Sequence, residues 1–455
     1  MIRHPSTFDL QGFVCGDLPE SVCWQIVAHL AAGCKACLDE VFIQMSLLFE
    51  AQDSADVVSA EIEQAYDGVI DRVFDSIRVK VQFAQEEADR AREDRILLEE
   101  KGAAGFVEDS VHLGGLGTYW ALLERMEAVR FEDPKEMVRL GHLATLVAEQ
   151  LPAERFGSDL VLHFRCRAVI ELSNAYRVAD ELTEAEALLG EAAELYESSD
   201  GDPLLGARLF DVQASLLGAY RRFNAAGGAL DAVYKTYLEH GDAHLAGRAL
   251  IKKALYTSYD GDSEGSLDLI QEALTLIDPD RDPSLMLLAL HNKALFLVES
   301  GYHRDSRILL WQAFSRFGQC MGKIQRLKFR WIEGKANAGL QEFDRAEQAL
   351  SEVRQGFKAT GLPYKSALVT LELAMVALRQ GHVEKAQWLV LEAAQVFEGL
   401  DIRREVLASA LLLRKAFETQ TITLGLLEDM YKFLNRAETD PNLTLKTWLA
   451  DARQA

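Results

Sequence analysis

The residues whose types and spacing best support chemistry are His29, Cys34 and Cys37, in the stretch AHLAAGCKACLDEV. Two cysteines separated by two residues can bind one metal ion, because the turn between them brings both sulfurs to tetrahedral angles. His29 stands near the end of a predicted helix and can present a ring nitrogen to the same point. Zinc prefers such soft and borderline ligands, so the sequence supplies three zinc ligands.

A closed structural zinc site needs a fourth ligand. Cys23 lies about 240° further around the same helix than His29 and roughly 9 Å along its axis, so these two side chains are poorly placed to share an ion. Cys15 and His4 precede this helix and can fold back, and we favour Cys15 as the fourth ligand. The alternative, a helical hairpin whose cysteines only pack, stays open at this point.

Two short helices are predicted to position these side chains. Pro19 opens the first, over residues 19–31, and Gly33 is placed to end it. A second helix is expected over about 36–50, with VFIQMSLLF on its buried side. The sequence therefore predicts a small zinc-binding helical hairpin over residues 1–50.

The bulk composition predicts an all-α protein. The chain has 455 residues, too many for one ordinary core, and only nine prolines. A formal net charge of −23 argues against direct binding to nucleic acid or to an anionic membrane surface. No run approaches the roughly 18 apolar residues that span a bilayer, so we expect a soluble, cytoplasmic protein.

The region after the hairpin divides into two predicted segments. Residues 51–105 form a charged helical segment, and we expect its end, EEADRAREDRILLEE, to be a solvated helix, with a partner-binding coiled coil as the alternative. Residues 106–117 are rich in glycine and are predicted to be a linker.

A repeat of about 40 residues follows Gly117, and its second helices open with small residues at intervals of 41, 39, 41, 40 and 40. These small residues are Ala185, Ala226, Gly265, Ser306, Ala346 and Ala386. A second small residue is expected twelve positions earlier, where the two helices of a hairpin touch. It is found at Ser173, Ala214, Ala294, Gly334 and Ala374. Lys253 breaks this rule, although Ala254 is adjacent.

This pattern, with an aromatic residue such as Tyr176 three positions after Ser173, resembles the tetratricopeptide repeat. The resemblance covers residues 118–438 and implies a superhelix of stacked helical hairpins, with a predicted capping helix over 439–455. The period exceeds the roughly 34 residues of the simple repeat, which longer helices or loops would explain.

In tetratricopeptide arrays the first helix of each pair lines a concave groove, so the resemblance also implies a binding surface. The implied groove residues are Arg167, Asn174, Arg177, Arg208, Asp211, His291, Lys328, Trp331 and Lys335. Several are basic, and a locally basic groove inside an acidic shell would attract an acidic peptide. Solvated arginines without a ligand are the alternative.

The order of His29, Cys34 and Cys37 resembles the zinc-binding domain of anti-sigma factors, over about residues 15–50. That family usually places three residues between the histidine and the first cysteine, whereas four stand here. The resemblance implies a structural zinc ion and binding to a sigma factor.

The stretch GDSEG at 261–265 matches the G-x-S-x-G pattern, but it lies in a turn between two predicted helices and follows no strand, so it is not a nucleophile elbow. The sequence contains no Walker-type phosphate loop, metalloprotease motif or kinase motif set. We therefore expect a non-enzymatic interaction and regulatory protein that binds a protein or acidic peptide in its groove, with the zinc hairpin as a second contact module. The alternatives are a soluble anti-sigma-type transcriptional regulator, or a scaffold or regulatory subunit of a separately encoded enzyme.

Overall fold

In a computed structural model of the chain, every described element is a helix. The structure describes residues 4–52, 60–109, 114–130, 132–199, 201–400 and 423–437, together with positions 413, 443 and 445. The chain divides into two compact units, Met1–Leu216 and Leu217–Ala455. Their boundary falls inside the range predicted as one solenoid. None of the described helices has the length and apolar character needed to cross a membrane.

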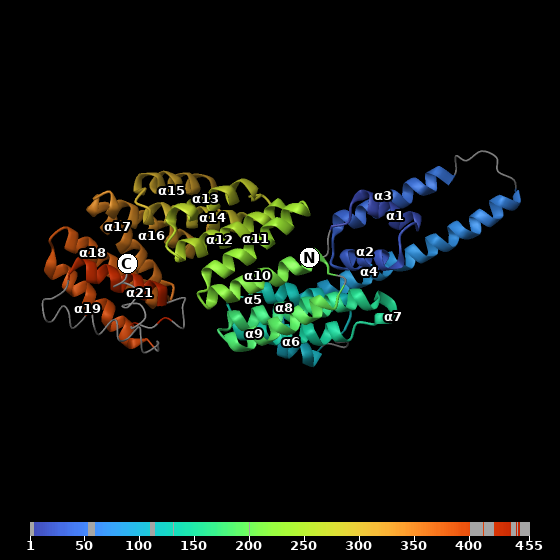
Figure 1. The fold of residues 1–455 in the computed structure, drawn as a ribbon, viewed down its shortest axis with the longest axis horizontal. Coiled ribbons are helices and arrows are strands. Elements are labelled where there is room, and N and C mark those ends of the chain that lie inside the picture. The colour runs from blue at the N-terminus through green and yellow to red at the C-terminus, as the bar shows by residue number, and fades with distance from the viewer. Residues whose placement is uncertain are drawn as a thin grey trace. The chain divides into compact units, whose positions relative to one another are not determined.

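The first unit begins with three helices before a much longer fourth one. The first two pack on the fourth helix, and the third packs on the first two (Figure 1). The helices are α1 (Thr7–Cys15), α2 (Glu20–Ala31), α3 (Lys35–Gln52) and α4 (Ala60–Asp109). Their shared core joins Phe13 of α1, Val27 of α2 and Val41 of α3 to Val81 of α4. Burial of these apolar side chains attaches the predicted hairpin to α4.

The charged helix was predicted to be solvated at its end, and the structure corrects this. Glu87, Ala91 and Leu98 of α4 are buried, and Leu98 joins the core built around the next helices. Part of the range 106–117, predicted as a linker, is helical: α4 continues to Asp109 with Phe106 fully buried, and α5 begins at Leu116. The chain bends within α4 instead, at Gly102, where φ is 67°.

The rest of the first unit consists of hairpins. The helices are α5 (Leu116–Val129), α6 (Pro134–Glu149), α7 (Ala153–Phe156), α8 (Ser158–Val178), α9 (Leu182–Glu197) and α10 (Pro203–Ala219), of which α10 spans the unit boundary. Proline at the first helical position opens α6 and α10, where its missing N–H costs nothing. Figure 1 shows α5, α6, α8 and α9 side by side, and α6 packs on both α5 and α8.

The second unit continues the same design, with each described helix packed on the next from α11 to α19, and α21 packed on α18. Its helices are α11 (Phe223–Glu239), α12 (Ala243–Tyr259), α13 (Ser263–Leu276), α14 (Pro283–Glu299), α15 (His303–Phe317), α16 (Lys323–Gly339), α17 (Phe343–Ala359), α18 (Pro363–Arg379), α19 (Val383–Gly399) and α21 (Leu424–Ala437). The predicted helix EVLASALLLRKAF and most of the predicted capping helix over 439–455 lie outside the described residues.

The structure corrects the repeat at one unit. Ser266 and Ala254 are fully buried between α12 and α13, so they take the places assigned to Gly265 and Lys253. With this change both rows of small residues run at intervals of 41, 40, 40, 40 and 40, counted from Ser173 and from Ala185. Close packing of the two helices explains why these positions carry small residues, since a Cβ atom added at Gly334 would lie 2.8 Å from Leu350 Cδ2.

In each of the six regular hairpins the turn contains one residue with a left-handed backbone conformation. It lies five positions before the small residue of the second helix, the row that starts at Ala185. These residues are Asp180, Arg221, Gly261, Gly301, Gln341 and Gly381. The residue after each donates its N–H back across the helix end, as Tyr302 does to the carbonyl oxygen of Leu297 at 2.8 Å. This is the 6→1 hydrogen bond of a Schellman cap. It ends the first helix of each hairpin at the same position of the repeat.

Candidate functional site

Four potential metal ligands converge at the N-terminal hairpin, namely His4, His29, Cys34 and Cys37. One ligand atom from each lies within 4.8 Å of all the others. His4 Nδ1 lies 3.1 Å from Cys37 Sγ, and His4 Nε2 lies 3.5 Å from Cys34 Sγ. A tetrahedral zinc ion with bonds of about 2.0 to 2.3 Å separates its ligands by roughly 3.3 to 3.8 Å. The two contacts of His4 lie near that spacing, and the 4.8 Å limit of the whole set lies about 1 Å above it, so the four side chains are close to the arrangement of a zinc site.

Local structure explains why these side chains meet. Gly33, with φ of 86°, reverses the chain after α2, whose last turn carries His29. The carbonyl oxygen of Cys34 accepts the N–H of Leu38, so Cys34 caps α3 and Cys37 lies in its first turn. Both cysteines therefore stand at the N-terminal end of α3, where unpaired N–H groups and the helix dipole would stabilise a metal-bound thiolate.

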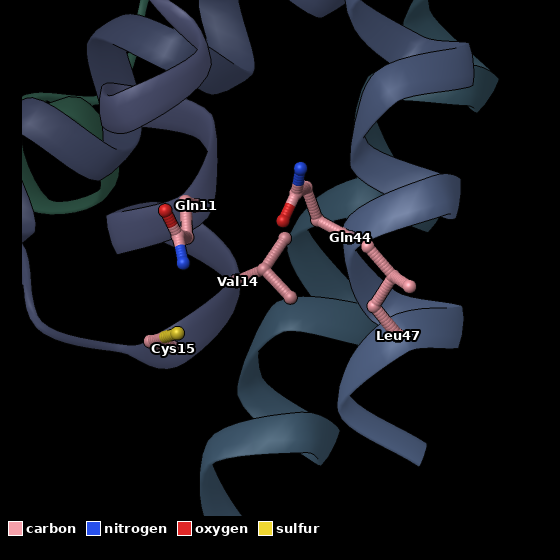
Figure 2. A pocket seen from close by; sticks show the side chains of 5 residues that line it. All are labelled: Gln11, Val14, Cys15, Gln44 and Leu47. Atoms are coloured by element: carbon pink, nitrogen blue, oxygen red, sulfur yellow. The ribbon is translucent and has the colours of Figure 1, made fainter. Parts of the chain in front are cut away.

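The structure places His4, and not Cys15, beside the other three residues. His4 precedes α1, whereas Cys15 is the last residue of this helix and lies roughly 12 Å along its axis from the first residue. Cys15 instead lines a pocket of about 220 Å³ between α1 and α3 (Figure 2). The remaining lining residues are Gln11, Val14, Gln44 and Leu47.

The protonation of the cluster suits a metal site. Burial, with the nearby His4, lowers the pKa of His29 to about 4, so its ring is neutral at pH 7. His29 Nε2 is buried and has no hydrogen-bond partner within the described part of the chain. Burial and the adjacent Cys34 raise the pKa of Cys37 to about 12, so a bound metal ion would displace a proton there. An orphaned, neutral imidazole nitrogen beside two thiols is a donor set that zinc accepts.

The predicted groove residues of the first unit form a charge-balanced network. Arg208 on α10 donates two hydrogen bonds to the carboxylate of Glu171 on α8, at 2.8 and 2.6 Å. Its third nitrogen donates to Asp211 at 2.9 Å. Arg167 Nε lies 2.8 Å from the same Glu171 carboxylate. Glu171 was not among the predicted residues, although its position four residues after Arg167 on one helix face indicates a pair.

Glu171 compensates the basic charge that the sequence led us to expect here. Burial by itself would raise the pKa of Glu171, but Arg208 and Arg167 outweigh burial and lower it to about 2. The carboxylate is therefore ionised throughout the physiological range. Arg177, also predicted for the groove, donates to Asn174 Oδ1 at 2.9 and 3.1 Å.

The predicted groove residues of the second unit meet around a buried carboxylate. Trp331 Nε1 on α16 donates to Glu372 Oε2 on α18 at 2.7 Å, and Lys335 Nζ lies 3.1 Å from Glu372 Oε1. The Lys335 ammonium also sits 5.2 Å from the Trp331 ring centre and 5.4 Å from that of Tyr431 on α21. Glu372 and Tyr431 were not among the predicted groove residues, because only the tertiary fold places them beside Trp331 and Lys335.

His291 and Lys328 complete the predicted set in this unit. His291 on α14 packs against Phe329 of α16, with ring centres 5.8 Å apart, and its Nδ1 lies 3.3 Å from Asn292 Oδ1. Burial lowers the pKa of His291 to about 4, so this ring is neutral at pH 7. Lys328 is exposed on α16.

A comparison with known protein families finds no match, and a comparison with curated proteins finds none. The chain is similar in structure to a Rap protein crystallised in complex with competence and sporulation factor, with a TM-score of 0.50 and 13% identity over 70% of this chain and 87% of that one. It also matches aspartyl phosphate phosphatase F from Bacillus subtilis (TM-score 0.49, 11% identity, 84% of this chain and 96% of that one).

A tetratricopeptide repeat protein from Parabacteroides merdae is a further match, with a TM-score of 0.41 and 14% identity over 66% of this chain and 99% of that one. The fold is a tetratricopeptide-like helical solenoid. The predicted all-α hairpin array is thus confirmed, by the packing of its helices and by the likeness to the Rap protein. At these identities the likeness concerns the fold alone.

Proposed function

We propose that this chain is a non-enzymatic interaction and regulatory protein whose tetratricopeptide-like solenoid binds a protein or peptide. The observation that carries the proposal is the set of polar and aromatic side chains on first helices of the second unit, where Glu372 holds Trp331 and Lys335 in place. Tryptophan side chains held in a fixed orientation, like Trp331, are among those that contribute most to binding at protein interfaces. The Rap protein of similar fold was crystallised with a bound factor, which supports the same use here.

The charge pattern constrains the ligand. Arg208 and Arg167 are neutralised by Glu171, and Lys335 by Glu372. A ligand carboxylate would have to compete with these internal carboxylates. The acidic peptide expected from sequence is therefore one candidate within a broader class of peptide and protein ligands, selected by contacts with Trp331 as well as by charge.

Affinity purification with mass spectrometry tests this assignment. Full-length wild-type protein is compared with Trp331→Ala, and Trp388→Ala serves as the matched control, because Trp388 on α19 is 76% exposed and is not a groove position. We expect a partner that is lost with Trp331→Ala and retained with Trp388→Ala. Partners retained by both variants would contradict binding at Trp331.

We propose further that His4, His29, Cys34 and Cys37 hold a structural zinc ion. Four protein ligands close the coordination shell and leave no position for substrate, which supports a non-enzymatic role. Zinc would hold the start of α1 against α2 and α3, so that the hairpin forms a second contact module. An enzymatic activity abolished by Cys37→Ser would overturn this reading.

A second candidate function is anti-sigma-type transcriptional regulation. The observation that favours it is His4, which gives the hairpin two histidines and two cysteines at one point. Pull-down of sigma factors from the source cell by the wild-type protein, lost with Cys34→Ser and kept with Trp331→Ala, would support this function. Failure of every sigma factor to bind the zinc-loaded protein would exclude it.

A further inference from the structure

Helices α1 and α3 lie side by side and run in the same direction. At one end, His4 before α1 meets Cys34 and Cys37 at the start of α3. At the other end, Val14 and Cys15 of α1 line the same pocket as Gln44 and Leu47 of α3 (Figure 2). The register of the two helices is therefore set at both ends, and we name the surface between them, with this pocket at one end, the α1–α3 channel.

Both helices carry large apolar side chains that are exposed. Phe8 on α1 is 80% exposed, and Ile43 and Leu47 on α3 are 52% and 53% exposed. Phe8 lies three residues before Gln11, which lines the pocket, and Ile43 lies four residues before Leu47, so each pair shares one helix face. Exposed apolar side chains gathered around a pocket are typical of an interaction surface.

The charges around the channel are predominantly acidic. The described charged side chains of α1, the turn after it, and α3 are Asp9, Asp17, Lys35, Asp39 and Glu40. Asp39 is one helical turn before Ile43, and Glu40 one turn before Gln44, which places both at one end of the channel. Asp17 lies at the other end, close enough to Cys15 to help raise the pKa of that thiol. An apolar strip flanked by these four acids and by Lys35 alone among bases complements an apolar strip flanked by lysine or arginine.

We propose that the α1–α3 channel docks an amphipathic α-helix of two to three turns, with apolar residues at i and i+4 and basic residues beside them. The length of the docked helix is set by the length of α1, whose nine residues span about 13 Å. This inference rests on the proposed role of the hairpin as a contact module, and it names the surface and the chemistry of its partner. A second copy of the chain fits poorly, because its own channel is equally acidic.

Selection of displayed peptides tests the docking site. A phage library of 14-residue helical peptides is panned against the full-length protein, and the winning peptides are synthesised and measured by fluorescence anisotropy. We expect enrichment of basic amphipathic sequences. Affinity should fall at least about tenfold for the surface variant Ile43→Ser/Leu47→Ser and stay unchanged for Trp388→Ser. The charge reversal Asp39→Lys/Glu40→Lys should also weaken binding, and added salt should weaken binding to the wild type.

Several outcomes would overturn the proposal. These are no enrichment, enrichment of acidic peptides, or winners that bind Ile43→Ser/Leu47→Ser as tightly as the wild type. Circular dichroism and zinc content would verify that this variant is folded, which is expected for exposed positions. A wild-type dimer in sedimentation that dissociates with the same variant would make this face a self-contact instead. Loss of partners with Trp331→Ala is independent of all these results, so the docking site and the solenoid assignment can fail separately.

Discussion

Nδ1 of His4 lies 3.1 Å from Sγ of Cys37, across 33 residues of sequence. This contact ties the start of the described chain to the first turn of α3 and completes a set of two histidines and two cysteines. It adds a polar contact to the apolar one that α1 makes through the buried side chains of Leu10, Phe13 and Val14. The hairpin and the solenoid then offer two chemically distinct surfaces on one chain.

The first prediction concerns the fourth ligand. Wild-type protein should purify with about one zinc per chain, as measured by inductively coupled plasma mass spectrometry. His4→Ala should lower zinc affinity by more than about 100-fold, because a ligand is lost outright. Cys15→Ser is the matched control and should keep full zinc content, since Cys15 lies outside the cluster. Loss of zinc in the Cys15 variant alone would reverse the assignment.

The second prediction concerns the buried network of the first unit. Arg208→Leu leaves Glu171 and Asp211 without their shared base, and we expect a loss of roughly 3 to 5 kcal/mol in the free energy of unfolding. The double variant Arg208→Leu/Glu171→Leu should lose less, because the buried Glu171 carboxylate, which keeps Arg167 but has lost Arg208, is removed as well. Urea unfolding followed by circular dichroism measures both. A double variant as unstable as the sum of the single variants would show that the pair is not coupled.

The pH dependence of stability follows from the same carboxylate. Because the folded pKa of Glu171, about 2, is below its ordinary value, unfolding binds a proton as the pH falls. The stabilisation is present above about pH 4.5 and is lost as the pH drops from there towards 2. Between pH 5 and pH 3 the wild type should lose more stability than Glu171→Gln, which has no carboxylate to protonate. Parallel urea midpoints for the two proteins across that range would refute the role of Glu171.

Close helix packing predicts opposite effects for two glycines of the second unit. Gly334→Ala would press a methyl group against Leu350 and should destabilise the protein by roughly 1 to 3 kcal/mol. Gly228→Ala, in the middle of α11 with no atom within 4 Å of the added Cβ, should stabilise by roughly 0.5 to 1 kcal/mol. Thermal unfolding of both variants checks this, and equal melting temperatures would contradict the packing account.

The left-handed turn position predicts a stabilising substitution. Gln341 has φ of 62°, a conformation that strains a residue with a Cβ atom, whereas Gly301 and Gly381 occupy the same place in neighbouring hairpins. Gln341→Gly should therefore raise the free energy of unfolding by roughly 1 kcal/mol. Gln341→Ala keeps the strain and should change stability little. A stabilisation as large for alanine as for glycine would rule out the backbone explanation.

The repeat could be predicted from the sequence because its signal is local. A small residue is required wherever two helices of a hairpin touch, so Ser173 and Ala185 report their contact by type and spacing alone. The same local signal failed at Gly265, because two adjacent small residues, Gly265 and Ser266, both satisfy it. Only burial identified Ser266. For α4 the charge pattern indicated a solvated helix, yet Leu98 and Phe106 face a core formed by elements that come later in the chain.

By itself the sequence determined the all-α repeat architecture, the C-x-x-C pair and the participation of His29, because helical period and ligand spacing act over a few residues. Only the tertiary structure decided that His4 completes the cluster, that Glu171 and Glu372 compensate the predicted groove bases, and that α1 and α3 lie side by side with exposed apolar residues such as Phe8 and Leu47. The reason is physical. Each of these features joins residues on different helices, and their approach depends on how whole helices pack, which no local spacing records.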